Sequence, residues 1–115
     1  IEAVLTDLFP DAIKIGMIGS ARVAEAVADE ITYLRTPVVF DPVMVASSGS
    51  ALADEPTIAA FEKLMRRSAV ITPNAIELAA LTGMAVSDEV SMLAAARELS
   101  AKQGAAVVAK GGHLA

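Results

Sequence analysis

The feature of this sequence that most constrains its fold is a regular alternation of short β-branched runs with longer, Ala-rich amphipathic segments. Apolar residues in the longer segments recur at helical spacing, as at Val23, Val27, Ile31 and Leu34. Strands that alternate with helices form parallel sheets through right-handed crossovers. The sequence therefore predicts the α/β class, with a mainly parallel sheet and helices on both of its faces.

The expected elements follow the order helix, strand, helix, strand, helix, strand, helix, helix, strand. Ser20, Asn74 and Ser87 are expected helix N-caps, and Gly83 is expected to end a helix. Residues 42–55 are expected to form a loop rich in small residues, and no domain boundary is predicted. The helices are expected at 1–8, 21–34, 56–67, 75–81 and 88–103, and the strands at 12–18, 37–41, 69–72 and 105–110.

Composition excludes several classes of function. The chain has 115 residues, a net charge of −5, 55% hydrophobic residues and no Cys. An acidic chain disfavours nucleic-acid binding, and the lack of Cys excludes a disulfide scaffold or a thiolate zinc site. Neither a bilayer-spanning apolar run nor an export leader is recognised, so a cytoplasmic protein without a membrane partner is expected. P-loop, dinucleotide-binding and nucleophile-elbow motifs are also absent from the sequence.

Charged residues that could bind a ligand cluster at the expected strand ends. Ligands bind open parallel sheets at the carboxyl ends of the strands. Asp41 and Lys110 end two of the expected strands, and Glu77 lies one turn into the helix after a third. Carboxylates hold Mg²⁺, and a lysine neutralises phosphate oxygens. The sequence therefore predicts a site for phosphate chemistry at this edge of the sheet.

Each of these residues also has a purely structural interpretation. Asp41 can serve a strand-terminating turn, and Asn74 can be only a helix N-cap. Glu77 is at position N3 after Asn74, where a capping box is equally natural. Lys110 can be a solvated strand end, and Met17 can be a core residue. The combination of three charged groups at one edge favours the functional interpretation.

Four segments in series resemble a known enzyme family. The chain is similar to the middle of a hydroxymethylpyrimidine/phosphomethylpyrimidine kinase, a thiamine-biosynthesis enzyme of the ribokinase-like superfamily. The resemblance covers essentially the whole chain, so residues 1–115 are expected to form a single partial ribokinase-like domain. The segments are Lys14-Ile15-Gly16-Met17, Asp41-Pro42-Val43-Met44 followed by Ser47-Ser48-Gly49, Thr72-Pro73-Asn74-Ala75-Ile76-Glu77 and Lys110-Gly111-Gly112-His113.

The resemblance implies an activity and a set of binding residues. The family phosphorylates the pyrimidine alcohol and then its monophosphate with ATP and Mg²⁺, and its members are commonly homodimers. Residues 47–50 are expected to lie in a loop near the site. The implied roles are phosphate binding by Lys110, Asn74 and Asp41, metal binding by Glu77 and Asp41, and substrate binding by Gly16, Met17, Val43 and Met44.

Two parts of the family pattern do not occur in this sequence. One is an opening strand with a Gly-rich segment that covers the substrate. The other is a later Gly-Thr-Gly-Cys-type segment that supplies the anion hole and the catalytic base. No catalytic base is therefore expected within the chain, and we expect weak Mg-nucleotide binding but no turnover from these residues alone.

Three alternatives remain open at this point. Pyridoxal kinase shares the fold, a DPVM-like turn and TPN-x-x-E, although KIGM and KGGH favour the pyrimidine enzyme. A receiver-type signalling domain fits Asp41, Thr72 and Lys110 loosely, but it needs an acidic pair where this chain has Gly16-Met17 and a fifth strand where four are expected. A non-catalytic binding remnant is the third alternative.

Overall fold

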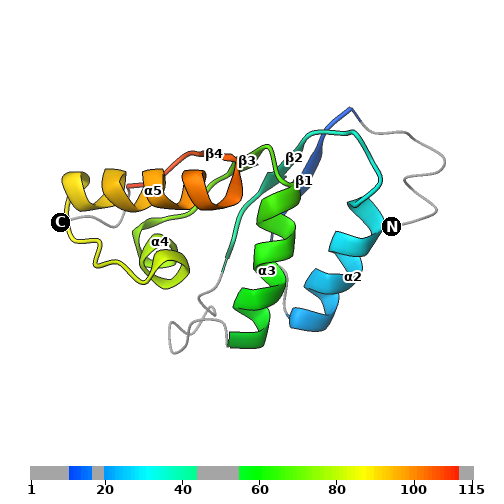
Figure 1. The fold of residues 1–115 in the computed structure, drawn as a ribbon, viewed down its shortest axis with the longest axis horizontal. Coiled ribbons are helices and arrows are strands. Elements are labelled where there is room, and N and C mark those ends of the chain that lie inside the picture. Colours follow the sequence, from blue (N-terminus) through cyan, green and yellow to red (C-terminus); the bar gives the residue numbers. More distant parts are fainter. Residues whose placement is uncertain (1–10, 17–19, 44–54, 112–115) are drawn as a thin grey trace.

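The computed structural model describes residues 11–16, 20–43 and 55–111. This part of the chain folds into a parallel four-stranded sheet and the helices that connect its strands (Figure 1). The strands are β1 (Ile13–Ile15), β2 (Val38–Phe40), β3 (Val70–Ile71) and β4 (Ala106–Val107). The helices are α2 (Ala21–Ile31), α3 (Glu55–Arg67), α4 (Ala75–Thr82) and α5 (Glu89–Gln103).

The strands lie side by side in sequence order, and every pairing is parallel. Successive residues of a strand point to opposite faces, so the register defines which side chains share a face. One row faces the helices and contains Ile15, Phe40, Ile71 and Val107. The neighbouring row, on the face that we call the outer face, contains Lys14, Val39, Val70 and Ala106.

The helix-facing row makes the core. Phe40 and Ile71 are fully buried, and the Phe40 ring meets the Phe61 ring of α3 edge to face at 5.2 Å between centroids. Aromatic pairs in this geometry stabilise a core beyond their buried area, by about 0.5–1.5 kcal/mol. Leu64 of α3 and Leu99 of α5 are also fully buried in the same cluster. The short strands are therefore held mainly by the helices that pack on one side of them.

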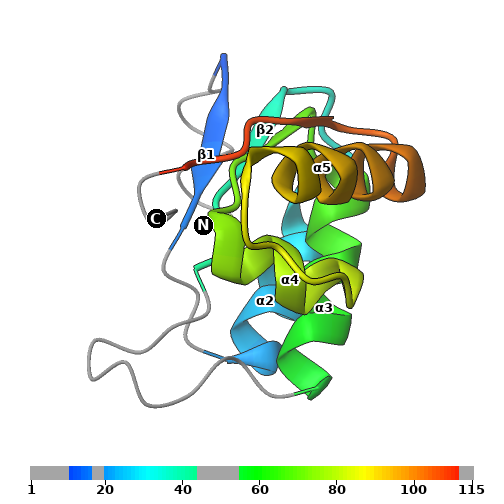
Figure 2. The ribbon, with the colours of Figure 1, turned by 90° about the vertical axis from the view of Figure 1, so that its left-hand side faces the viewer.

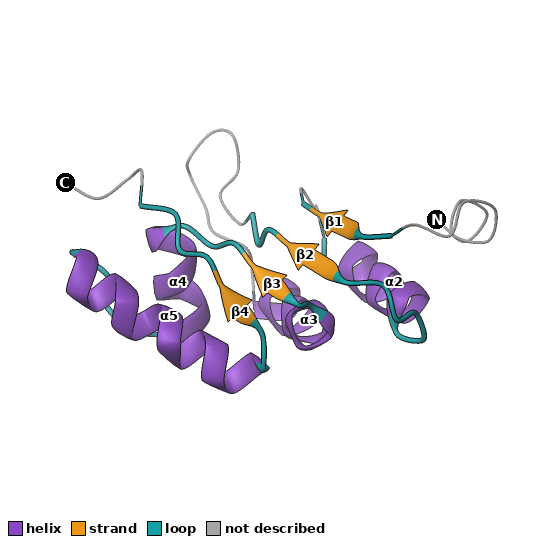
Figure 3. Ribbon diagram, turned by 90° about the horizontal axis from the view of Figure 1, so that it is seen from above, coloured by secondary structure: helices purple, strands orange, loops and turns teal. Residues whose placement is uncertain are grey.

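The α/β class and the parallel sheet are confirmed, but the helices are not distributed as expected. The sequence predicts helices on both faces, whereas the described helices lie on one side of the sheet (Figures 2 and 3). The reason is the strand order, since each connection moves one position in the same direction. Crossovers of the same hand then place every connecting helix on the same face.

The observed strands are all shorter than the predicted ones, and α2 ends at Ile31 instead of Leu34, whereas α3 and α4 are each one residue longer than predicted. β4 spans Ala106–Val107 where residues 105–110 are predicted. The predicted helix over residues 1–8 lies outside the described residues, as does most of the predicted loop over 42–55. No helix in the described part of the chain is both long and apolar enough to span a bilayer.

Helix capping agrees with the sequence at three positions and differs at one. Ser20 and Asn74 are N-caps, and Gly83 ends α4 with a φ of 72°. The predicted N-cap Ser87 is wrong, because Asp88 accepts the Ser91 N–H at 2.8 Å and begins α5. Hydrogen bonds from the Ser91 side chain and backbone lower the pKa of Asp88. The carboxylate can therefore replace a hydroxyl as the cap over most of the pH range.

Arg67 joins the end of α3 to the end of α2. Its guanidinium donates to the carbonyl oxygens of Ile31, Leu34 and Thr36, with Nε to Ile31 at 3.0 Å and Nη2 to Thr36 at 2.9 Å. Ile31 is the last residue of α2, and Leu34 and Thr36 lie in the connection to β2, so these carbonyls are at the end of the helix, where helical N–H partners run out. One side chain therefore orders the whole α2–β2 connection and fixes the start of β2.

We expect Arg67→Met to lower the free energy of unfolding by about 1.5–3 kcal/mol, because charge-assisted bonds to several carbonyls are lost together. Arg66→Met is the matched control, since Arg66 makes only an exposed pair with Glu62 in the same helix. That variant should change stability by about 0.5 kcal/mol or less. Urea unfolding of both variants measures the difference, and equal midpoints would contradict the proposed role of Arg67.

Candidate functional site

The candidate site lies on the outer face, where the strands reach their carboxyl ends. The ladder continues one step past the strands through Asp41 N–H to Ile15 O at 2.8 Å, Thr72 N–H to Phe40 O at 3.0 Å and Val108 N–H to Ile71 O at 2.9 Å. Asp41, Thr72 and Val108 are each two residues beyond an outer-face residue, so their side chains share that face. The outer face thus changes from mostly apolar to polar toward this edge.

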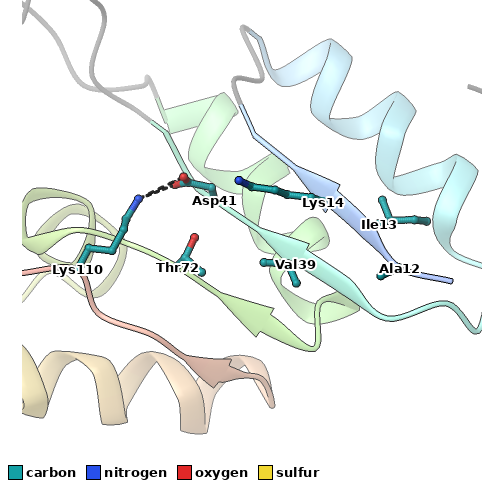
Figure 4. A pocket seen from close by; sticks show the side chains of 7 residues that line it. All are labelled: Ala12, Ile13, Lys14, Val39, Asp41, Thr72 and Lys110. Atoms are coloured by element: carbon teal, nitrogen blue, oxygen red, sulfur yellow. Dashed lines mark hydrogen bonds and ion pairs between the residues drawn. The ribbon is translucent and has the colours of Figure 1, made fainter. Parts of the chain in front are cut away.

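A pocket of about 620 Å³ occupies this edge, and we call it the strand-end pocket. Its lining comes from β1 and β2 and from the segments that follow β2, β3 and β4, which are far apart in the sequence (Figure 4). The pocket therefore exists only because the sheet has formed in this order. Its lining residues are Ala12, Ile13, Lys14, Val39, Asp41, Thr72 and Lys110.

Asp41 and Lys110 form an ion pair across the strand-end pocket. The Lys110 Nζ lies 3.2 and 3.3 Å from the two carboxylate oxygens of Asp41. The Lys110 side chain is 46% exposed and that of Asp41 21% exposed, so water competes for both. A pair this exposed contributes about 0–1 kcal/mol. The contact therefore orients the two groups without preventing either from exchanging its partner for a ligand.

The backbone reverses immediately after Asp41. Val43 N–H donates to Asp41 O at 2.9 Å, which closes a three-residue turn around the buried Pro42. Proline suits this position because its φ is fixed and it has no N–H to satisfy. The turn ends β2 so that Asp41 is held at the sheet edge and Val43 follows it, half-buried, beside the same edge.

Asn74 and Glu77 form a complete capping box at the start of α4. The Asn74 side chain accepts from Glu77 N–H at 2.8 Å, and Glu77 Oε1 accepts from Asn74 N–H at 2.8 Å. Glu77 is only 3% exposed. Asn74 also pairs with Lys110 in a parallel bridge, supported by Lys110 N–H to Pro73 O at 2.8 Å. The cap therefore places the positive end of α4 next to the strand segment that carries Lys110.

The structure brings some predicted site residues together and separates others. Asp41 and Lys110 are in contact, and Gly16 is beside them, since a Cβ on Gly16 would lie 3.9 Å from the Asp41 Cβ. Glu77 is engaged in the cap, and in the described segments no group of three or more His, Asp or Glu side chains is arranged to hold a metal. Met17, Met44 and residues 47–50 lie outside the described residues.

Two polar residues of the pocket lining, Lys14 and Thr72, have no ligand-binding role predicted from the sequence. The spacing along the strands could have indicated both residues, because Lys14 is two residues before Gly16 and Thr72 is two residues before Asn74. Residues at this spacing share a face of the sheet. The KIGM and TPN-x-x-E segments thus each carry an additional pocket residue within their own strand.

A parallel sheet with a lysine and a carboxylate at the carboxyl ends of its strands is typical of α/β proteins that bind ligands at that edge. Comparison with known proteins specifies the family. The protein-family model for phosphomethylpyrimidine kinase matches residues 1–115, so the chain belongs to this family. This finding overrides the receiver-type alternative.

The curated relatives are longer than this chain. It is 41% identical to the hydroxymethylpyrimidine/phosphomethylpyrimidine kinase of Rhizobium meliloti, covering 98% of this chain and 43% of the relative. It is 42% identical to the thiamine biosynthesis bifunctional protein ThiED of Geobacter sulfurreducens, covering 99% of this chain and 24% of that protein. The chain thus spans less than half of the length of these relatives.

Solved structures agree with this fold. The phosphomethylpyrimidine kinase of Clostridium difficile matches with a TM-score of 0.84 and 32% identity, over 98% of this chain and 50% of that one. A Bacillus subtilis pyridoxal kinase solved as an ADP complex matches with a TM-score of 0.83 and 32% identity, over 97% of this chain and 43% of that one. Both proteins are ribokinase-like kinases.

Glu77 variants separate capping from charge. Gln at position N3 can accept the same N–H, so Glu77→Gln should leave the melting temperature near that of the native chain. Glu77→Ala removes the acceptor and leaves a gap at a buried position, and we expect it to cost about 1–2 kcal/mol. Thermal unfolding followed by circular dichroism distinguishes them. Equal destabilisation by both substitutions would show that the buried charge, and not the cap, holds this helix end.

Proposed function

We propose that this chain contributes to the ATP-dependent phosphorylation of hydroxymethylpyrimidine and of its monophosphate in thiamine biosynthesis, with no turnover by these residues alone. Membership of the family and the names of the curated relatives support the reaction. The observation that carries the proposal for these residues is the Asp41–Lys110 pair in the strand-end pocket. The family resemblance places the anion hole and the catalytic base in segments that this sequence lacks.

Lys110 has the properties of a phosphate-binding residue. Its ammonium faces the strand-end pocket, and the whole side chain is nearly half exposed. Phosphate oxygens can therefore replace the Asp41 carboxylate as the partner of the ammonium. Phosphoryl transfer depends mainly on positioning and on neutralising charge, and a lysine supplies both. We propose that Lys110 binds nucleotide phosphates and that Asn74 keeps the neighbouring helix N-terminus in place for them.

Asp41 and Glu77 are the proposed metal residues, and they fit Mg²⁺ unequally. The Asp41 carboxylate lines the strand-end pocket and can hold a hydrated cation. Glu77 is buried and one of its oxygens already accepts the Asn74 N–H, so it suits contact through water better than direct ligation. When bound, Mg²⁺ neutralises charge on the phosphates. Asp41 would hold the cation directly or through its water shell, and Glu77 through water.

The substrate is proposed to bind beside Gly16 and Val43, and the family resemblance also implies substrate contacts by Met17 and Met44, which lie outside the described residues. Gly16 is exposed and lies next to Asp41, where the missing side chain leaves room for a planar ring. A pyrimidine at this point would present its hydroxymethyl group toward Asp41 and Lys110. This placement explains why a glycine ends β1 at the pocket.

Gly16→Ala tests this placement. The added Cβ would be at ordinary contact distance, 3.9 Å, from Asp41 Cβ, so the fold should tolerate it. We expect an unchanged melting temperature and at least about fivefold weaker pyrimidine binding, since one methyl group occupies ring space. Titration calorimetry with hydroxymethylpyrimidine measures the binding. Native affinity in a folded Gly16→Ala chain would exclude Gly16 from the substrate contact.

Pyridoxal phosphorylation is a second candidate, because the Bacillus subtilis pyridoxal kinase matches this fold almost as well as the phosphomethylpyrimidine kinase does. Parallel titrations with hydroxymethylpyrimidine and pyridoxal decide between the two substrates. Tighter binding of pyridoxal would favour the second candidate. A homodimeric state and a cytoplasmic location are further proposals that rest on the family.

Lys110→Met tests the proposed function directly. Lys102→Met is the matched control, because Lys102 lies on α5, away from the strand-end pocket, and pairs with Glu62 of α3 at the surface. Removing one charge-assisted phosphate contact should weaken MgATP binding about tenfold or more in Lys110→Met and leave it unchanged in Lys102→Met. Calorimetry with MgATP measures both. No binding by the native chain, or equal binding by Lys110→Met, would contradict the proposal.

A further inference from the structure

The strand-end pocket contains a second lysine that the phosphate-binding pair leaves unused. Lys14 and Lys110 face Asp41 from opposite sides (Figure 4). Lys110 is paired with Asp41, whereas Lys14 takes part in no ion pair among the described residues. Two lysines against one aspartate give the lining a net charge of +1, in a chain whose net charge is −5. The pocket is therefore a local cationic site in which Lys14 has no ion-pair partner within the described part of the chain.

The position of Lys14 is unusual for a solvated surface lysine. It lies in the central position of β1, on the outer face, paired with Val39 in a row that is otherwise apolar. Asp41 is two residues beyond Val39, about 6.6 Å further along the same face. The four-carbon stem of a lysine spans a similar distance, and the Lys14 side chain extends toward Asp41 in Figure 4. The ammonium is therefore delivered to the strand-end pocket from the side opposite Lys110.

We propose that Lys14 binds the phosphate group already present on the phosphorylated substrate and so distinguishes phosphomethylpyrimidine from the neutral alcohol. This inference rests on the proposed function. A phosphomonoester carries a charge of about −1.5 to −2 at neutral pH, whereas the alcohol carries none. The Lys14 ammonium, on the side of the pocket where the substrate is proposed to bind, therefore gains an interaction only with the phosphorylated substrate.

The second phosphorylation shows why two separate cations are required. An oxygen of the acceptor phosphate forms a bond to the γ-phosphorus of ATP, and the bond from that phosphorus to the β,γ-bridging oxygen breaks. The electron pair of the broken bond leaves with ADP, and a dianionic acceptor has no proton to lose. Both reacting groups are anions, so their approach is opposed by charge repulsion. Lys110 lowers this repulsion on the nucleotide side and Lys14 on the acceptor side.

The test compares Lys14→Met with the native chain in three titrations, with MgATP, hydroxymethylpyrimidine and hydroxymethylpyrimidine phosphate. Met keeps the length and packing of the stem without the charge. The ratio of affinities for the phosphate over the alcohol should fall about tenfold, as expected for the loss of one charge-assisted contact. Lys14→Arg should restore most of the ratio. Lys63→Met, which removes an exposed lysine of α3 paired with Glu25, should leave the ratio at its native value.

The outcomes separate this inference from the proposed function. If the native chain binds all three ligands and Lys14→Met keeps the native ratio, Lys14 does not recognise the substrate phosphate and the proposed function stands. A loss confined to MgATP would place Lys14 on the nucleotide side and also overturn the inference. No binding of any ligand by the native chain would overturn both. Melting curves of Lys14→Met and Lys14→Arg establish that each variant is folded.

Discussion

The parallel pairing of four strands in sequence order is the constraint on which the rest of the structure depends. It sends one row of side chains into the helices and the neighbouring row to the outer face. Because every strand runs in the same direction, all four also end at the same edge. Lys14, Asp41, Thr72 and Lys110 are thereby collected in one pocket, although nearly the whole chain separates the first from the last. No individual contact in that pocket is strong enough to assemble it.

The energetics divide in the same way. The sheet is held in register by the burial of Phe40, Ile71 and the residues packed on them. The hydrogen bonds from Arg67 to carbonyls at the end of α2 add to this. The polar groups of the outer face contribute little stability, because the Asp41–Lys110 pair is exposed. The pocket can therefore exchange its internal ion pair for contacts with a ligand without loosening the sheet. This separation is what allows charge-removing substitutions there to report on binding.

The sequence predicts the parts of this structure that depend on local patterns. Helix positions, the Asn74 cap and the meeting of Asp41 with Lys110 at one edge follow from periodicity, capping chemistry and the rule for strand ends. The side of the sheet that the helices cover does not follow from these rules, since it depends on strand order, which periodicity does not specify. Ser87 and Asp88 are both good N-caps, and only the backbone geometry selects Asp88. Spacing along β1 places Lys14 on the same face as Gly16, but its position relative to Asp41 depends on the register of β1 against β2, which the sequence does not specify.

Glu77 shows how a structural and a functional interpretation can both apply to one residue. Its Oε1 accepts the Asn74 N–H, so the carboxylate is fixed in place by the cap. The same cap fixes Asn74, which pairs with the strand segment that carries Lys110. A carboxylate held this rigidly costs little additional entropy when a hydrated cation approaches it. The capping box is therefore compatible with the proposed role of Glu77 in phosphate chemistry, because it pre-organises the helix N-terminus and the Glu77 carboxyl group close to the strand segment that carries Lys110.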